Sequence, residues 1–332
     1  MRLDIIVVNW NSREQLRECL ETIPAACRDS FILSRVVVVD NGSMDGSADG
    51  LQNIPIPLTL VRNRENRGYI AASNQGARGS QADYLLFLNP DTRLFENSLA
   101  TPLAFMERPE NQNVGAASIQ LVDEQGQVFR GCSRHPAART ILAATLGLDR
   151  LMPRWFQPQY MIEWDHNTNR QVDQPSGAFF LVRRPLFEAL GGFDERFFVY
   201  FEDYDFSLRA KQAGWVAFHV AEAKVFHKGS GTLERVKGIR LFYLLRSRLH
   251  YAYKHFGWWS ATAVLLATLF VEPFTRLVLA IVQRSGENVL ATFGGMFRLY
   301  IDLPMIFRDI RRFGAANRNR ISMKTAPAAK AR

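Results

Sequence analysis

The chain has 332 residues, of which 47% are apolar and 22% are charged. This balance is typical of a folded globular protein and excludes a disordered one. The three cysteines form no Cys-x-x-Cys pair, so we expect a reducing compartment and no thiolate metal site. The strand-like N-terminus is too short for the apolar core of a signal peptide, which favours a cytoplasmic protein.

The formal net charge of +9 is concentrated near the C-terminus. Residues 308–332 hold eight Arg or Lys residues and a single Asp, a net +7, so the rest of the chain carries only +2. A nearly neutral body argues against a nucleic-acid partner. We predict that 308–332 is a flexible basic tail that an anionic membrane surface attracts. A solvated terminus without a partner is the alternative.

In chain order, the first 120 residues or so alternate between apolar, strand-like runs and polar, helix-like stretches. This alternation predicts an α/β fold with a mostly parallel sheet and helices on both faces. The predicted strands are 5–8, 36–39, 58–61, 84–88 and 114–119, and the predicted helices lie near 12–22, 71–78 and 97–107.

The later part of the chain divides into three stretches. Residues 137–169 contain Pro, Trp and Arg without periodicity and are expected to form loops over the sheet. A second ordered block is expected over 174–227, and a helix over 237–256.

Residues 258–282 form an apolar stretch long enough to span a bilayer. Glu272, Pro273 and Arg276 interrupt it, and charges at bilayer depth are costly. We therefore expect a segment that lies in the membrane interface. A buried helix pair and a re-entrant or spanning hairpin are the alternatives.

The run Leu85-Leu86-Phe87-Leu88 ends abruptly in Asn89-Pro90-Asp91. A buried strand would therefore deliver a carboxylate to the edge of the sheet, where ligands bind in open α/β sheets. A carboxylate there can hold a divalent cation against substrate phosphates. The alternative is an ordinary turn, because Asn, Pro and Asp are common turn residues.

The strand over 36–39 likewise ends in Asp40, followed by a Gly- and Ser-rich turn. An acid in this position suits hydrogen bonding to a nucleoside base or ribose, whereas a local turn and helix cap is the alternative for Asp45 and Ser47. Neither a Rossmann G-x-G-x-x-G nor a P-loop occurs, which removes the main support for dehydrogenases and P-loop phosphotransferases.

An ordered set of motifs runs from the first strand to about residue 255. Its members are Val8-Asn9-Trp10-Asn11, Val39-Asp40-Asn41-Gly42-Ser43, Asn66-Arg67-Gly68-Tyr69, Ser73-Asn74-Gln75-Gly76, Leu88-Asn89-Pro90-Asp91, Ser176-Gly177-Ala178-Phe179-Phe180, Gly191-Gly192-Phe193-Asp194, Phe201-Glu202-Asp203-Tyr204-Asp205 and Val225-Phe226-His227. The set resembles the family 2 inverting glycosyltransferases with a GT-A fold, most closely their bacterial rhamnosyltransferase-like branch.

The resemblance implies roles for individual residues. Asp91 matches the last acid of the metal-binding D-x-D element, in which Asn89 replaces the first acid, and His227 matches a further metal or diphosphate contact. The implied cofactor is a divalent cation, Mg²⁺ or Mn²⁺. Lys228 and Arg235 are candidates for neutralising the leaving diphosphate. The residues that would bind the donor nucleotide are Asn9, Asp40, Asn66, Gly68, Asn74 and Asn89.

The cluster Glu202-Asp203-Tyr204-Asp205 suits the second half of the reaction. An inverting transfer needs a base for the proton of the acceptor hydroxyl, and crowded acids among aromatic residues favour a raised carboxyl pKa. The resemblance places this catalytic base at Asp203, with Glu202, Asp205 and Gly177 supporting the acceptor side. A plain helix N-terminus is the alternative, above all for Asp205.

We therefore predict an inverting, metal-dependent glycosyltransferase on the inner face of the cell membrane. The expected donor is a nucleoside-diphosphate sugar, which the resemblance implies to be dTDP-rhamnose, and the expected acceptor is lipid-linked or a surface polysaccharide. The alternatives are a UDP-hexose or UDP-hexosamine transferase, a nucleotidyltransferase and a non-catalytic nucleotide-sugar-binding protein. The catalytic domain would cover 1–235, with a donor half to about 120 and an acceptor half from about 121. A helical membrane-associating region over 236–307 and the basic tail would follow.

Overall fold

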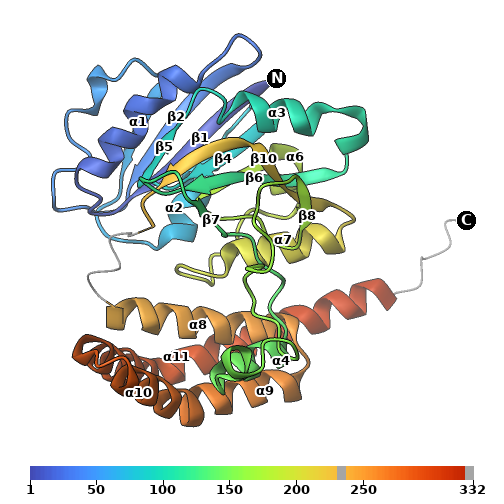
Figure 1. Cartoon of the computed structure of the whole chain (residues 1–332). Coiled ribbons are helices and arrows are strands. Elements are labelled where there is room, and N and C mark those ends of the chain that lie inside the picture. The colour runs from blue at the N-terminus through green and yellow to red at the C-terminus, as the bar shows by residue number, and fades with distance from the viewer. Residues whose placement is uncertain (230–236, 326–332) are drawn as a thin grey trace, which may run out of the picture. The chain divides into compact units, whose positions relative to one another are not determined.

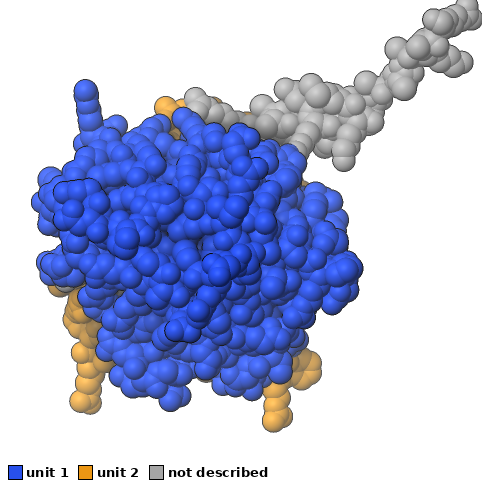
Figure 2. All heavy atoms as spheres, turned by 90° about the horizontal axis from the view of Figure 1, so that it is seen from above, with its two compact units in different colours: residues 1–136, 157–235 blue, residues 137–156, 236–332 orange. Residues whose placement is uncertain are grey.

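The computed structural model describes residues 1–229 and 237–325, with side chains through residue 311. Two compact units are distinguished: residues 1–136 with 157–235, and residues 137–156 with 236–332, coloured separately in Figure 2. Arg235, predicted to contact the diphosphate, lies outside the described residues.

The first unit is built on one sheet with the strand order β3-β2-β1-β4-β9-β6-β10-β5, in which β7 also pairs with β6 and β8 with β10 (Figure 1). The strands are β1 (Arg2–Asn9), β2 (Ile32–Asp40), β3 (Leu58–Arg62), β4 (Tyr84–Leu88), β5 (Thr92–Leu94), β6 (Val114–Val122), β7 (Val128–Phe129), β8 (Arg170–Val172), β9 (Phe179–Arg183) and β10 (Val216–His227).

The strands predicted over the first 120 residues or so are all present. Strands β1, β2, β3 and β4 pair in parallel, as expected, and β10 is parallel to β6. The sheet as a whole is mixed, because β9 runs antiparallel between β4 and β6 and β5 runs antiparallel to β10. The antiparallel β9 therefore begins at the edge where β4 ends.

Helices cover both faces of this sheet, as predicted. Alternate residues of a strand point to opposite faces, so Leu3 and Ile5 of β1 pack in one core cluster with Leu16 of α1, whereas Val8 packs with Ala72 of α2. The helices of this unit are α1 (Glu14–Ala26), α2 (Tyr69–Ala77), α3 (Ala100–Glu107), α6 (Arg184–Ala189) and α7 (Glu202–Gln212), with short 3₁₀ turns η1 (Leu51–Asn53) and η2 (Pro109–Asn111).

The second unit is helical. Its elements are α4 (Ala138–Thr145), α5 (Leu148–Leu151), α8 (Lys237–His255), α9 (Trp258–Leu266), the π-helical η4 (Ala267–Val271), α10 (Glu272–Val282) and α11 (Gly286–Thr325). The C-terminal helices that we predicted are thus present. Helix α11 continues into the range predicted to be a flexible tail, of which 326–332 lie outside the described residues.

The prediction of loops over 137–169 is wrong for its first part, since α4 and α5 form there. Ile141 of α4 is buried and packs in one cluster with Leu245 of α8 and Val264 of α9. The segment is a helix because it packs its apolar face within the helical unit, a tertiary contact that the short, polar-flanked sequence did not reveal.

Two stretches of this unit, Trp258–Val282 and Gly286–Arg311, are long and apolar enough to cross a membrane by length and composition. Glu272, within the first stretch, is only 3% exposed and pairs with Arg248 and with Arg276, whose Nη2 lies 2.7 Å from its Oε1. The charges that interrupt the apolar stretch are therefore paired within the helical unit. Their presence is thus a weaker reason to exclude a deeper position of this stretch in the bilayer.

Candidate functional site

Most of the predicted site residues gather at one edge of the sheet because of strand direction. Asn9, Asp40 and Asn89 end or follow the parallel strands β1, β2 and β4, so they share the carboxyl edge. The strand order reverses between β1 and β4, which is where open α/β sheets bind ligands. Because β9 enters the sheet from this edge, the N–H of Asn89 donates to the carbonyl of Ala178 at 3.0 Å.

Asp40 is held by Asn9 at the ends of their paired strands. The Asn9 Nδ2 donates to Asp40 Oδ1 at 2.9 Å, and also to the hydroxyls of Ser43 and Ser47. Its Oδ1 accepts from Ser12. Asn9 is fully buried, and its side chain positions Asp40 and the following turn, so its part in nucleotide binding stays a prediction.

The Asn66–Gly68 segment is tied to the end of β2 through Asn41. The Asn41 Nδ2 donates to Asn66 Oδ1 at 2.8 Å and to the Gly68 carbonyl at 3.1 Å, and Asn66 Oδ1 also accepts from the Gly68 N–H at 2.9 Å. Asn41 also accepts from the N–H of Arg67. The sequence prediction missed Asn41, although its place directly after Asp40 was the available signal.

Gly68 and Asn74 lie against residues 193–198. A Cβ on Gly68 would lie 2.7 Å from the Phe198 carbonyl, and the φ of +88° also favours glycine. The Asn74 Nδ2 donates to the Phe193 carbonyl at 2.9 Å, and its Oδ1 accepts from the Phe193 N–H at 3.0 Å. These contacts give Asn74 a structural role, and its contact with the donor stays a prediction.

The predicted metal ligands Asp91 and His227 lie together because β5 pairs antiparallel with β10. The register places His227 opposite Thr92, and the His227 Nε2 lies 3.4 Å from Asp91 Oδ1. The following N–H, that of Lys228, donates to the Asp91 carbonyl at 3.1 Å. In the described ranges, no group of three or more His, Cys, Asp or Glu side chains is arranged to hold a metal.

This pair nevertheless fits a cation shared with a substrate. Mg²⁺ typically binds one or two carboxylates together with substrate phosphates and water, without a cage made only of protein. Asp91 supplies one carboxylate and His227 one imidazole nitrogen, and both side chains are largely buried. The donor set suits a divalent cation that also binds a diphosphate.

Asp203, the predicted base, lies at the N-terminus of α7 in a narrow setting. Its Oδ2 accepts a hydrogen bond from Gln174 Nε2 at 2.6 Å, and its Oδ1 accepts from the Tyr204 N–H at 2.8 Å. A Cβ on Gly177 would lie 2.9 Å from Asp203 Oδ2. Gly177 thus leaves the space that the carboxylate occupies, and Gln174 is a partner that the sequence prediction missed.

The electrostatics around Asp203 favour a proton acceptor. Burial raises the pKa of Asp203 to about 6, against the opposing effect of its hydrogen bonds. Burial and the Asp203 carboxylate raise the pKa of Glu202 still further, so Glu202 holds its proton more firmly than Asp203 does. Burial also raises the pKa of the Tyr69 hydroxyl, and the carboxylates of Glu202, Asp203 and Asp91 add to this effect. The Tyr69 hydroxyl is therefore close enough to be affected by the charges of Asp91 and of the Glu202–Asp203 pair.

The backbone that leads into α7 is strained. Tyr200 and Phe201 are consecutive non-glycine residues with φ of 68°, in the left-handed region. Each such residue costs on the order of 1–3 kcal/mol and persists only where the surroundings enforce it. The strained turn precedes Glu202 and Asp203 in the first turn of the helix, where the Asp203 carboxylate lies next to Gly177.

Asp205, predicted to support the acceptor side by orienting this segment or contacting the acceptor, is bound within the fold. It is fully buried, and Arg209 Nε lies 2.8 Å from its Oδ2. The same guanidinium donates to the carbonyls of Leu190 and Gly192 at 2.8 and 2.9 Å. Asp205 therefore fixes α7 to the turn after α6 and has no surface for an acceptor.

The model of glycosyl transferase family 2 matches residues 4–191. An N-acetylglucosaminyl-diphospho-decaprenol L-rhamnosyltransferase of Mycobacterium tuberculosis is 29% identical over 277 residues, covering 78% of this chain and 87% of that protein. Rhamnosyltransferase WbbL of Escherichia coli is 29% identical over 236 residues, covering 67% of this chain and 81% of that one.

The fold is also similar to solved glycosyltransferases. The mannosyltransferase PcManGT from Pyrobaculum calidifontis, solved in complex with GDP-Man and Mn²⁺, superimposes with a TM-score of 0.53 at 18% identity, covering 95% of this chain and 86% of that one. The order of the strands in the sheet and the match to the family model both indicate the same fold. The chain therefore belongs to glycosyl transferase family 2, is rhamnosyltransferase-like in sequence and has a GT-A-like α/β fold.

Proposed function

We propose that this glycosyltransferase moves a sugar from a nucleoside diphosphate to an acceptor hydroxyl with inversion, and that Asp203 is the general base. The observation that carries the proposal is the setting of Asp203. Its carboxylate lies in the space that a side chain at Gly177 would fill, accepts a hydrogen bond from Gln174 and has a raised pKa. A base with a pKa near the working pH combines adequate basicity with an ionised ground state.

The reaction is a single displacement in this proposal. The acceptor oxygen attacks the anomeric carbon as Asp203 takes the proton from that oxygen. The bond from the anomeric carbon to the diphosphate oxygen breaks, and the nucleoside diphosphate leaves with the bonding electrons. Glu202, with its higher pKa, stays protonated beside Asp203 and leaves a single negative charge on the pair near neutral pH.

On the donor side, Asp40 would contact the nucleoside, held in place by Asn9, and the Asn66–Gly68 segment would line the donor pocket. Asp91 and His227 would hold a divalent cation, Mg²⁺ or Mn²⁺, together with the diphosphate. When bound, such a cation neutralises the charge that develops on the leaving group. Asn89 would add an amide oxygen near this corner, and Lys228 extends the same edge with a positive charge.

The names of two relatives support a proposal for the donor and acceptor classes. The Mycobacterium tuberculosis relative is named as an L-rhamnosyltransferase that acts on N-acetylglucosaminyl-diphospho-decaprenol, and the Escherichia coli relative is named as a rhamnosyltransferase. We therefore propose rhamnose from dTDP-rhamnose as the donor sugar and a lipid-linked acceptor in cell-wall or surface-polysaccharide synthesis. The donor half would occupy about 1–120 and the acceptor half about 121–235.

We also propose that the helical unit attaches the enzyme to the inner face of the cell membrane. Large apolar side chains are exposed on its helices, with exposed fractions of 84% for Trp259 and 68% for Phe274 on the first apolar stretch and 65% for Phe297 on α11. An apolar helical surface of this kind suits the membrane interface, where a lipid-linked acceptor resides.

The variant Asp203→Asn tests the proposed base. Donor affinity should stay within about two-fold of the wild type, whereas transfer to a lipid-linked acceptor should fall by at least about a hundred-fold, because general-base catalysis contributes roughly 10²–10⁴-fold. Asp29→Asn, which changes an exposed aspartate, is the matched control. Released nucleoside diphosphate is measured with dTDP-rhamnose, UDP-glucose and UDP-N-acetylglucosamine. A near wild-type rate for Asp203→Asn would rule out Asp203 as the base.

A further inference from the structure

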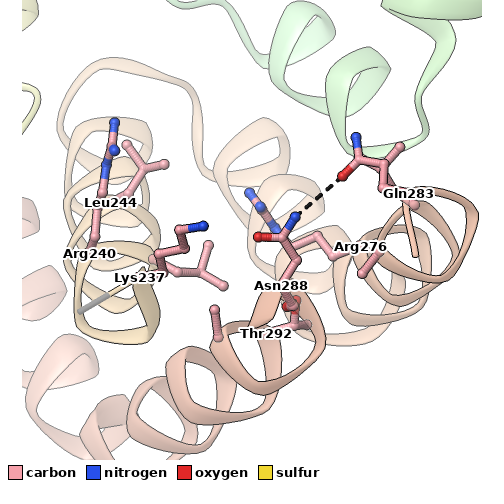
Figure 3. A pocket seen from close by; sticks show the side chains of 11 residues that line it. Lys237, Arg240, Leu244, Arg276, Gln283, Asn288 and Thr292 are labelled. Carbon is pink, nitrogen blue, oxygen red and sulfur yellow. Dashed lines mark hydrogen bonds between the residues drawn. The ribbon is translucent and has the colours of Figure 1, made fainter. Parts of the chain in front are cut away.

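The helical unit contains a pocket of about 310 Å³ between α8, α10 and α11 (Figure 3). Polar side chains from all three helices line it, and Lys237 of α8 and Asn288 of α11 point toward one another across it. The principal polar lining residues are Lys237, Arg240, Arg276, Gln283, Asn288 and Thr292. The pocket belongs entirely to the second unit and is separate from the residues of the proposed transfer reaction.

Positive charge exceeds negative charge around this pocket. Lys237 pairs with Glu287 at 2.7 Å, but both side chains are well exposed, at 39% and 66%. Arg276 shares the buried Glu272 with Arg248, so one carboxylate faces two guanidinium groups. Arg240, an exposed lining residue, has no carboxylate partner in the part of the chain that the structure describes. The excess favours an anionic ligand.

Neutral groups of the pocket also suit a ligand that accepts hydrogen bonds. The Asn288 Nδ2 donates to Gln283 Oε1 across a long 3.3 Å contact, which leaves the Gln283 amide nitrogen without an acceptor among the described residues. Guanidinium, ammonium and amide donors around one space match phosphate oxygens, which only accept at neutral pH.

The apolar surroundings point to an amphiphile. Exposed apolar side chains occur in the same turns of α10 and α11 as the lining residues: Ile281 and Val282 are 68% and 73% exposed, and Leu290 and Phe293 are 74% and 60% exposed. Apolar lining is present as well, from Leu241, Leu244 and Leu279. A ligand with one anionic end and one hydrocarbon end would satisfy both kinds of surface.

We propose that this pocket binds the phosphate headgroup of an anionic membrane lipid, with the acyl chains on the neighbouring apolar side chains. The inference rests on the membrane attachment proposed above and adds a lipid class to it, because diffuse attraction of the basic C-terminus requires no pocket. Lys237 and Arg240 from α8 and Arg276 from α10 would contact the phosphate, and the amide of Gln283 would add a neutral donor.

The test uses the full-length protein and the double variant Lys237→Gln/Arg240→Gln. Its matched control is Arg298→Gln/Arg308→Gln, which removes the same charge from exposed positions of α11 outside the pocket. Monomeric dihexanoyl-phosphatidylglycerol is titrated by calorimetry, which probes the pocket without a bilayer. Because charge-assisted hydrogen bonds are roughly twice as strong as neutral ones, we expect affinity to fall at least about ten-fold in the pocket variant and less than about two-fold in the control.

Two further measurements are needed. The first distinguishes an anionic lipid from a neutral lipid and from free diphosphate, and the second distinguishes the lipid pocket from membrane attachment in general. Dihexanoyl-phosphatidylcholine and inorganic diphosphate should bind at least about ten-fold more weakly than the phosphatidylglycerol, since each lacks either the net charge or the chains. Equal binding of free diphosphate, or an equal loss in both double variants, would overturn the lipid site. Pelleting with phosphatidylcholine vesicles tests membrane attachment alone, so a protein that pellets but shows no phosphatidylglycerol preference refutes only the pocket.

Discussion

Replacing Gln174 by Met tests how the proposed base is tuned. Gln174 is 3% exposed, and its Nε2 donates to Asp203 Oδ2 at 2.6 Å. Methionine has a similar length but no donor, so the variant removes this hydrogen bond with little change in volume. A hydrogen bond to the ionised form lowers a carboxyl pKa, and its loss therefore raises the pKa of Asp203 further.

The expected shift follows from the strength of the bond. A hydrogen bond to a charged group contributes about 1.5–3 kcal/mol, and 1.36 kcal/mol corresponds to about one pKa unit. The pKa of Asp203, about 6 in the wild type, should rise by about one to two units. The acidic limb of the kcat/KM profile should move to higher pH by the same amount, whereas kcat/KM on the alkaline side should stay close to the wild-type value.

The measurement is the pH dependence of kcat/KM, followed by released nucleoside diphosphate. Gln171→Met, an exposed position on β8, is the control and should leave the profile unchanged. Thermal unfolding shows whether the variant is folded. If the acidic limb of folded Gln174→Met coincides with that of the wild type, the hydrogen bond does not tune the base, and the reasoning is refuted.

Three other variants probe the same site and its support. Gly177→Ala places a Cβ 2.9 Å from Asp203 Oδ2 and should lower kcat at least about ten-fold at unchanged donor affinity. The control Gly257→Ala adds a Cβ in open space and should leave kcat unchanged. Equal kcat values in the two variants would show that a Cβ at residue 177 does not disturb Asp203. Arg209→Met removes one partner of the buried Asp205 and should cost on the order of 3–5 kcal/mol in urea unfolding, an expectation that a loss below about 1 kcal/mol would exclude. Asp203→Asn should raise Tm near pH 8 but not near pH 4. The raised pKa of Asp203 in the folded state makes wild-type stability fall as pH rises through about 6. If the Tm of the variant differs from that of the wild type by the same amount at both pH values, the buried carboxylate does not destabilise the fold.

The strand edge of the site could be predicted from the sequence because its strands are short apolar runs that stop at polar residues. Asn9, Asp40 and Asn89 each end or follow such a run, and parallel pairing brings them to one edge. The pairing of Asp91 with His227 depended on the resemblance, since the two lie far apart in the sequence and meet only through β5 and β10.

The support of the site could not be predicted, because it depends on contacts between distant segments. Gln174 reaches Asp203 across 29 residues, and Asn74 reaches Phe193 across 119. The spacing of Asp205 and Arg209 on one helix allows their ion pair, but the burial of Asp205 and the hydrogen bonds from Arg209 to the Leu190 and Gly192 carbonyls required the packed structure. Likewise, α4 forms a helix because Ile141 is buried in the helical unit.

The anomeric configuration of the first glycosylated product is decisive for the proposed mechanism. A single displacement with Asp203 as the base gives one inversion at the anomeric carbon and involves no enzyme nucleophile. We therefore predict that NMR of the product, formed before any further reaction, shows the configuration opposite to that of the nucleotide sugar. Retention of the donor configuration would contradict the single-displacement mechanism and the role assigned to Asp203.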